Sequence, residues 1–300
     1  MRASNRQWCA VTSGTIRPAR RPRGWRAPGP PPAGPGDDPT LQPAAGEDLC
    51  YLAGDWRIFQ HVGGHRWSLD DLATAWLAAE EVSPRPPARV ADLGCGIGTV
   101  LMLLAWRFPD ARIEGLEAEG QKVALAQRSL RWNGCTGRCV VRVGDLREPA
   151  ALDGPFDLVT GTPPYLPRGT ATEPARPDRG PWHFEHRGGI EDYCRAAARL
   201  LAPGAPFVVC AGTLQEARVQ DAAVAAGLCV TRRRDVVPRA GKGALFALYV
   251  LRAAPAEAAS AEPPLVVRDA RGAWTPAFRA VRRAMGMPDR PPGDSVEGIP

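Results

Sequence analysis

The sequence has very little lysine: Lys122 and Lys242 are its only two lysines, against 36 arginines in 300 residues. Such a bias can reflect the base composition of a genome, so a single arginine is weak evidence for a nucleic-acid partner. The net charge of +6 also comes mainly from one region. Residues 1–44 carry seven arginines against two acids, whereas residues 45–252 carry 25 basic and 24 acidic residues.

Long apolar runs are absent as well. No stretch approaches the roughly 18–20 apolar residues that a membrane-spanning helix needs, and no apolar signal segment follows Met1. We therefore expect neither a membrane partner nor a secretory signal. Residues 1–36 contain no acid, which is typical of an organelle transit peptide but equally of a disordered Arg/Pro tail. The expected localisation is cytoplasmic, or an organelle if residues 1–36 are a transit peptide.

Closely spaced cysteine pairs are missing too. None of the eight cysteines belongs to a Cys-x2-Cys pair, and Cys135 and Cys139 have no companion cluster of Cys or His. Several cysteines lie in apolar runs, as buried thiols do. The pattern favours a reducing compartment and predicts no metal site.

The two ends of the chain differ from its centre. Residues 1–47 are rich in Pro and Gly and poor in apolar residues, so we expect a disordered or targeting tail. Residues 253–300 read as a linker and C-terminal tail, in which Trp274–Gly286 can form one short helix. The apolar residues and the strand-forming patterns lie mainly in residues 48–252, which we expect to be the folded domain.

The folded part opens with an expected hairpin over Trp56–Trp67, turning at Gly63-Gly64. A helix follows from Ser68, with Asp71 placed to complete a capping box. Strands and helices then alternate. Strands are expected at 88–94, 111–117, 138–145, 156–161, 205–212, 228–237 and 244–251, and helices at 98–108, 118–134, 189–204 and 213–227.

The early strands are continuously apolar, as in a parallel sheet covered on both faces. The sequence therefore predicts an α/β domain with a doubly wound, mostly parallel, seven-stranded sheet and a small N-terminal hairpin–helix extension. In such a domain the ligand crevice lies at the carboxyl ends of the strands.

The strongest motif is "DLGCGIG", which runs from Asp92 to Gly98 between the first strand and its helix. Gly94, Gly96 and Gly98 lack a Cβ, so the backbone can turn sharply and approach a ligand. Such a loop alone is also ordinary strand-to-helix turn chemistry. Two acids favour ligand binding over an ordinary turn, because each lies at the end of a predicted strand. Glu117 is placed to accept hydrogen bonds from ribose hydroxyls, and Asp145 from an adenine amino group.

The Asp-x-Gly-x-Gly-x-Gly loop, with acids closing the second and third strands, resembles the class I S-adenosylmethionine-dependent methyltransferases. The resemblance covers residues 88–251 and implies a Rossmann-like methyltransferase fold with S-adenosyl-L-methionine as cofactor. That cofactor has an amino-acid moiety and a sulfonium rather than a pyrophosphate, which suits an acidic loop.

The fourth strand ends in Thr162-Pro163-Pro164-Tyr165. This stretch resembles the Asn/Asp/Ser-Pro-Pro-aromatic motif of methyltransferases that act on adenine N6, guanine N2 or the glutamine amide. An amino group offers two N–H donors, so its site needs two acceptors, here the Thr162 side chain and the Pro163 carbonyl. The prolines hold that carbonyl in place, and the Tyr165 ring can stack on a planar acceptor.

Threonine departs from the motif at its first position. The Thr162 hydroxyl can still accept one hydrogen bond, but its methyl group and short reach change the geometry. Catalytic weakening therefore stays open, and so does the plain alternative that Pro163-Pro164-Tyr165 is a turn. In the strand context we favour an acceptor site at Thr162, Pro163, Pro164 and Tyr165, with Thr162 also near the cofactor.

The stretch His65-Arg66-Trp67-Ser68-Leu69-Asp70 and the helix after it resemble bacterial tRNA adenine-N6 methyltransferases of the methyltransferase small domain group. The resemblance implies that this helix covers the cofactor and that Asp70 belongs to the cofactor site. Residues 167–188 contain arginines and Trp182, which suit phosphates and stacked bases. Arg232-Arg233-Arg234 is a second candidate RNA patch, although a solvated strand end explains it equally.

We therefore expect an S-adenosylmethionine-dependent N-methyltransferase that acts on adenine N6 of tRNA, with tRNA or other RNA as partner. The alternatives are a protein glutamine-amide N5-methyltransferase, or a catalytically weakened cofactor- or RNA-binding protein. A monomer and a homodimer are both compatible with the sequence.

Overall fold

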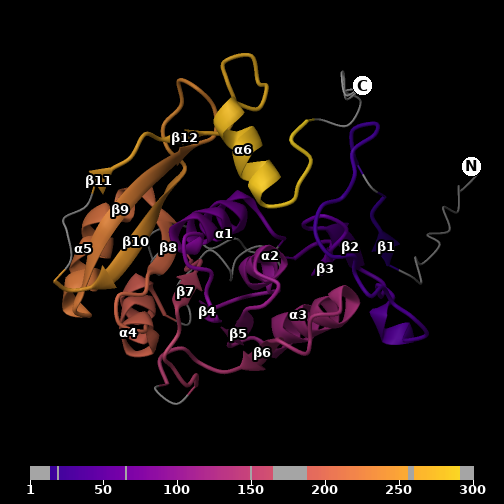
Figure 1. Ribbon diagram of the computed structural model, residues 1–300, viewed down its shortest axis with the longest axis horizontal. Helices are drawn as coiled ribbons and strands as arrows, with labels where there is room; N and C mark the ends of the chain where they lie inside the picture. Colours follow the sequence, from indigo (N-terminus) through magenta and orange to yellow (C-terminus); the bar gives the residue numbers. More distant parts are fainter. Residues whose placement is uncertain are drawn as a thin grey trace, which may run out of the picture.

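The computed structural model describes residues 14–18, 20–64, 66–148, 151–164, 188–255 and 260–290. Within these residues the largest element is a sheet of strand order β11-β9-β10-β8-β7-β4-β5-β6, in which β12 also pairs with β9 (Figure 1). The strands are β4 (Arg89–Leu93), β5 (Arg112–Glu117), β6 (Cys139–Val143), β7 (Leu158–Gly161), β8 (Phe207–Gly212), β9 (Leu228–Val237), β10 (Phe246–Ala253), β11 (Ser260–Ala261) and β12 (Leu265–Val266).

The sheet has the predicted direction pattern. Strands β6, β5, β4, β7 and β8 run parallel to one another, and β10 is antiparallel to both β8 and β9. The seven longer strands thus confirm the predicted doubly wound, mostly parallel sheet. The two-residue strands β11 and β12 extend its β9 edge.

Helices cover both faces of this sheet, and each face has its own apolar core. One core includes Val90 and Ile113 and packs on α1, α2 and α3. The other includes Ala91 and Val159 and packs on α4 and α5. The helices are α1 (Leu69–Val82), α2 (Thr99–Arg107), α3 (Gly120–Asn133), α4 (Ile190–Leu200) and α5 (Glu216–Ala225).

No helix in the described ranges combines the length and the apolar character that crossing a bilayer requires. The longest helices, α1 and α3, have 14 residues each, against the roughly 20 that a span needs.

The N-terminal hairpin lies earlier in the chain than expected. Strands β2 (Glu47–Tyr51) and β3 (Arg57–His61) pair antiparallel, and the turn between them is closed by the Leu52 N–H, which donates to the Trp56 carbonyl at 2.9 Å. The prediction of a turn at Gly63-Gly64 is therefore wrong. Strand β2 was missed because its first two residues are acids.

Part of the predicted disordered tail is also built into the fold. β1 (Thr15–Ile16) pairs parallel with β2, and a 3-10 turn, η1 (Pro39–Leu41), contacts α3. The expectation of disorder therefore fails for the described residues between 14 and 47. The small sheet lies beside α3 in Figure 1, on the far side of the molecule from β9 and β11. A transit peptide within residues 1–36 and the domain limits 48 and 252 stay predictions.

Three glycines from distant segments explain how the ends of the chain are held. Gly29, Gly54 and Gly286 each contact the Trp106 indole so closely that an added Cβ would lie within 3.0 Å of one of its atoms. The Gly54 N–H also donates to the Gly286 carbonyl at 2.7 Å. The N-terminal tail, the β2–β3 turn and the C-terminal segment thus all pack against Trp106 of α2.

The C-terminal segment contains the helix expected there, α6 (Pro276–Ala284). The Thr275 hydroxyl caps it by accepting from the Phe278 N–H at 3.1 Å. Phe278, Val281 and Met285 are buried in the same core as α1 to α3, so this short helix docks on the domain.

Candidate active site

The predicted site residues lie at one edge of the large sheet because the strand ends are in register. Leu93 at the end of β4 pairs with Leu116 of β5 and with Gly161 of β7. Glu117 pairs with Val143, the last residue of β6. The glycine loop, Glu117, Asp145 and Thr162 therefore all follow strands that end at the same edge.

The glycine loop has the backbone that its sequence predicts. Gly94, Gly96 and Gly98 have φ values of +60°, +56° and +86°, a region that residues with a Cβ rarely adopt. Their surroundings differ. An added Cβ on Gly94 would lie 2.0 Å from the Tyr193 hydroxyl, and one on Gly98 would lie 3.2 Å from Ala126. Apart from its chain neighbours, no described residue has an atom within 4 Å of an added Cβ on Gly96, so among these residues the backbone is open to a ligand.

Glu117 holds this loop in place. Its Oε2 accepts from the Gly96 N–H at 2.9 Å, and its Oε1 accepts from the Glu119 N–H at 2.9 Å. The side chain is buried. A carboxylate is thus fixed directly beside the open position at Gly96, where it can meet hydroxyl groups of a ligand.

Asp92 is a structural link rather than an open acid. Its Oδ1 accepts from the Thr160 hydroxyl at 2.8 Å, and its Oδ2 accepts from the Leu101 N–H at 3.1 Å. The residue therefore ties β4 to β7 and to α2. Burial raises the pKa of Asp92 to about 7, with a smaller contribution from the charge of Glu117, although the two hydrogen bonds favour the ionised form.

This pKa predicts a pH dependence of stability. Between pH 4 and 7 the unfolded chain, with Asp92 near its ordinary pKa of 3.8, has lost a proton that the folded protein keeps. The free energy of unfolding contributed by Asp92 therefore falls as pH rises through this window and is constant on either side. We expect urea unfolding at pH 5 and pH 8 to differ less in Asp92→Asn than in the wild type. An equal difference in both proteins would contradict the assignment.

Tyr193 of α4 belongs to the site but was not predicted. Its ring lies against both strand ends: an added Cβ on Gly161 would lie 2.7 Å from the ring, and Gly94 contacts its hydroxyl. Burial raises the pKa of Tyr193 well above its ordinary value, and the charges of Glu117 and Asp92 raise it further. In the sequence, the glycines at positions 94 and 161 were the feature that could have indicated a large side chain packed against these strand ends.

The N-terminus of α1 also lies near the site. The Ser68 N–H donates to Asp71 Oδ2 at 3.0 Å, which is one half of the predicted capping box. Burial raises the pKa of Asp71 well above its ordinary value, followed by the charges of Asp70 and Asp92. Helix α1 itself packs against β7 and β8. Asp70 itself accepts from the Ser68 hydroxyl and the Asp71 N–H.

Asp145 has a local partner. Its Oδ1 accepts from the Arg147 N–H and Nε at 2.9 Å, and its Oδ2 accepts from Nε at 3.0 Å. Asp145 lies two residues beyond the end of β6, and Arg147 fixes the orientation of its carboxylate. Its contact with an adenine amino group stays a prediction.

The acceptor motif is described only in part. Thr162 is partly exposed, Pro163 is buried and Pro164 is partly exposed, directly after β7. Tyr165 and the arginine-containing segment up to residue 187 lie outside the described residues. The roles of Thr162, Pro163, Pro164 and Tyr165 therefore stay predictions.

The Arg232–Arg234 patch does not offer free charge. Arg232 pairs with Glu81 and Glu262, Arg234 with Glu262, and Arg233 with Glu216 and Asp235. These arginines hold β9 to α1 and to the C-terminal segment, so the interpretation as an RNA patch is wrong.

The described residues fit the predicted cofactor. Among the described residues the backbone at Gly96 is open, and the fixed carboxylate of Glu117 stands beside it, which suits a donor that carries hydroxyl groups and a positive charge. A doubly wound sheet with this loop and these acids is the architecture of a class I methyltransferase.

Comparisons with known proteins agree with this class. Residues 55–175 match the methyltransferase small domain family. The release factor glutamine methyltransferase of Moorella thermoacetica is 30% identical over 229 residues, which cover 69% of this chain and 76% of that protein. The chain therefore belongs to the S-adenosylmethionine-dependent methyltransferases with a methyltransferase small domain, which confirms the family and the cofactor expected from the sequence.

Other relatives differ in their named substrates. The release factor glutamine methyltransferase of Rhodospirillum rubrum is 33% identical over 196 residues, 58% of each chain. The tRNA1(Val) (adenine(37)-N6)-methyltransferase of Porphyromonas gingivalis is 30% identical over 136 residues, 44% of this chain and 52% of that one. The matches thus span little more than half the length of these two relatives.

A solved structure supports the fold. A predicted O-methyltransferase from Agrobacterium tumefaciens superposes with a TM-score of 0.57 at 22% identity, covering 73% of this chain and 98% of that one. At this identity the similarity concerns the fold alone.

Proposed function

We propose that the protein transfers a methyl group from S-adenosyl-L-methionine to a planar exocyclic amino group, with adenine N6 of tRNA as the acceptor. The observation that carries this proposal is the position of Thr162-Pro163 at the end of β7, beside the glycine loop of β4. In this arrangement Gly94, Gly96, Glu117 and the start of α1 would hold the donor, and residues 162–165 would hold the amine.

Methyl transfer to an amine depends on positioning the two reactants and needs no covalent enzyme intermediate. When bound, the cofactor supplies an activated methyl group. The Thr162 hydroxyl oxygen and the Pro163 carbonyl can accept the two N–H groups of the amine, which leaves the nitrogen lone pair facing the methyl. An N–C bond then forms as the C–S bond breaks, and one amine proton leaves to water. Proline suits this task because it has no N–H to compete for the acceptors.

Two observations support RNA as the substrate. One relative is named as a tRNA adenine-N6 methyltransferase. In addition, five arginines line a single pocket beside the N-terminal hairpin, where they can meet phosphates. A protein substrate is the second candidate, because a relative matched over 76% of its length is named as a release factor glutamine methyltransferase.

Transfer of a tritiated methyl group separates these candidates. We expect label in total tRNA, recovered as N6-methyladenosine after digestion, and none in release factors. Label in protein but not in tRNA would favour glutamine. Binding of S-adenosylhomocysteine by calorimetry without any transfer would indicate a weakened enzyme and would overturn the proposal.

The acceptor loop gives a second prediction. Tyr165→Ala should lower the rate of transfer by about 10–100-fold, because stacking on a base contributes about 1–3 kcal/mol. Affinity for S-adenosylhomocysteine should not change. Thr162→Asn introduces the amide oxygen of the family motif and serves as the comparison: retained or increased transfer supports acceptor geometry. A Tyr165→Ala variant with unchanged turnover would argue against stacking.

A further inference from the structure

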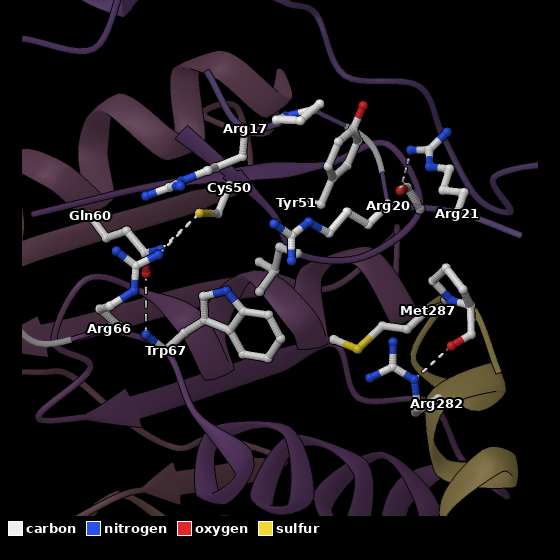
Figure 2. A pocket seen from close by; sticks show the side chains of 15 residues that line it. Arg17, Arg20, Arg21, Cys50, Tyr51, Gln60, Arg66, Trp67, Arg282 and Met287 are labelled. Atoms are coloured by element: carbon white, nitrogen blue, oxygen red, sulfur yellow. Dashed lines mark hydrogen bonds between the residues drawn. The ribbon is translucent and has the colours of Figure 1, made fainter. Parts of the chain in front are cut away.

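A pocket of about 560 Å³ lies between the N-terminal hairpin and the C-terminal segment, away from the strand ends (Figure 2). Four parts of the chain line it: the tail around Arg20, the hairpin around Tyr51, the stretch Arg66-Trp67, and residues from Arg282 to Pro288. None of the predicted catalytic or cofactor residues lines it. The pocket is therefore a separate feature of the molecule.

The lining is unusually rich in positive charge. Arginine makes up 36 of the 300 residues of the chain but five of the 15 residues around this pocket. The arginine bias of the whole sequence, about one residue in eight, does not account for one in three. The five are Arg17, Arg20, Arg21, Arg66 and Arg282.

Carboxylates neutralise only part of this charge. Arg17 and Arg66 share one buried partner, Asp48, and Arg21 pairs with Asp55. Among the described residues neither Arg20 nor Arg282 forms an ion pair. Five guanidinium groups therefore face two carboxylates, which leaves a surplus of three positive charges around one pocket.

Asp48 holds two of the arginines in fixed positions. Its Oδ2 accepts from Arg17 Nε at 2.9 Å and from Arg66 Nη1 at 2.9 Å. Its Oδ1 accepts from Gln60 Nε2 at 3.0 Å. These bonds, with a contribution from Cys50, overcome burial and lower the pKa of Asp48 to about 2. The anchor stays ionised at neutral pH, so the two guanidinium groups are oriented before any ligand arrives.

Arg282 is held by a carbonyl and an aromatic ring rather than by an ion pair. Its Nε donates to the Pro288 carbonyl at 2.6 Å, and its guanidinium lies 4.2 Å from the centre of the Trp274 ring. Burial lowers the pKa of Arg282 to about 10. Arg282 is partly buried, and the charge of Asp289 offsets only part of the effect of burial on its pKa. An anion in the pocket would offset the remaining cost. Figure 2 shows its guanidinium directed toward the pocket, below Met287.

The remaining lining is apolar and aromatic. Trp67 and Met287 form one wall, and Trp67 is only partly buried. Two guanidinium groups already stack on the Tyr51 ring: that of Arg57 lies 4.0 Å and that of Arg21 4.5 Å from the ring centre. Trp67 is thus the ring best placed to meet a planar group beside a phosphate.

We propose that this pocket binds a backbone phosphate of the RNA substrate, with an adjacent base against Trp67. The inference rests on the proposed function and deepens it. Arg66 and Trp67 directly precede Ser68, which caps α1, and Asp70. RNA bound here would therefore touch the chain immediately before α1, the helix predicted to cover the cofactor.

Arg20 offers the cleanest test, because it is exposed and its replacement removes charge without breaking an ion pair among the described residues. We expect Arg20→Gln to weaken tRNA binding about 3–10-fold in 0.1 M salt and to reduce the slope of log K against log salt by about 0.7–0.9. Arg282→Gln should act in the same direction. Calorimetric affinity for S-adenosylhomocysteine should stay unchanged in both variants.

Arg85→Gln is the matched control. Arg85 is exposed too, but it follows α1 at the opposite edge of the sheet, and its replacement should leave the salt slope unchanged. If tRNA is methylated but Arg20→Gln and Arg282→Gln bind it like the wild type, the pocket proposal fails alone. If the wild type neither binds nor methylates tRNA, both proposals fail. Competition by adenosine monophosphate as strong as by tRNA, compared per phosphate, would also overturn a site for an RNA backbone.

Discussion

Replacing Gly96 by alanine is expected to weaken binding of S-adenosylhomocysteine by about 10–100-fold while the protein stays folded. Apart from its chain neighbours, no residue that the structure describes has an atom within 4 Å of an added Cβ at Gly96, so a methyl group there clashes with none of these residues. It would instead occupy the position through which a ligand reaches the backbone. Overpacking of this kind costs about 1–3 kcal/mol, which corresponds to about 10–100-fold in affinity.

The backbone strain of this substitution needs its own control, and Gly36 provides one. Gly36 has a φ of +50°, close to the +56° of Gly96, and it too has nothing within 4 Å of an added Cβ. Both variants should therefore lose similar stability in urea, whereas only Gly96→Ala should lose affinity in calorimetry. Equal affinities would contradict the placement of the cofactor at this loop.

Asp48→Ala should destabilise the protein by about 1–3 kcal/mol, because it removes a buried carboxylate that accepts several hydrogen bonds. Arg17 and Arg66 lose their shared partner, but their side chains are 44% and 39% exposed, so water can solvate them. Gln60 and Cys50 lose their acceptor as well. The effect should appear as a lower midpoint of urea unfolding, with the largest loss of hydrogen-exchange protection in β2 and β3.

Asp55→Ala is the comparison for this prediction. Asp55 pairs with Arg21 in the same hairpin, but its side chain is 42% exposed, and exposed pairs contribute about 1 kcal/mol or less. If the two variants unfold at the same urea concentration, the buried cluster around Asp48 does not stabilise the hairpin as inferred here.

The sequence was sufficient to predict the large sheet and the strand-end loop. The apolar character of β4 and β7 predicts strands that are buried on both faces of the sheet. The glycines of residues 94–98 predict a loop with positive φ. Both features are local, so they can be recognised from neighbouring residues alone. The predicted position of Glu117 at the end of β5 follows from the same strand pattern.

The parts that were missed depend on partners far away in the chain. Glu47 and Asp48 make β2 look like a polar loop, yet both are buried because arginines of other segments neutralise them. Tyr193 reaches Gly94 across about 100 residues of sequence. Long-range pairing of this kind leaves no periodic pattern, so neither the hairpin position nor Tyr193 could be predicted from local sequence.

The packing of Tyr193 against Gly161 has an evolutionary consequence. Because this contact joins the end of β7 to α4, the two anchors of residues 165–187 are fixed next to each other, whatever path those residues take. Lengthening a segment between fixed anchors costs little, about 0.6 kcal/mol for each doubling. If residues 162–187 hold the methyl acceptor, as proposed, this segment can change in length while the contact between β7 and α4 stays the same.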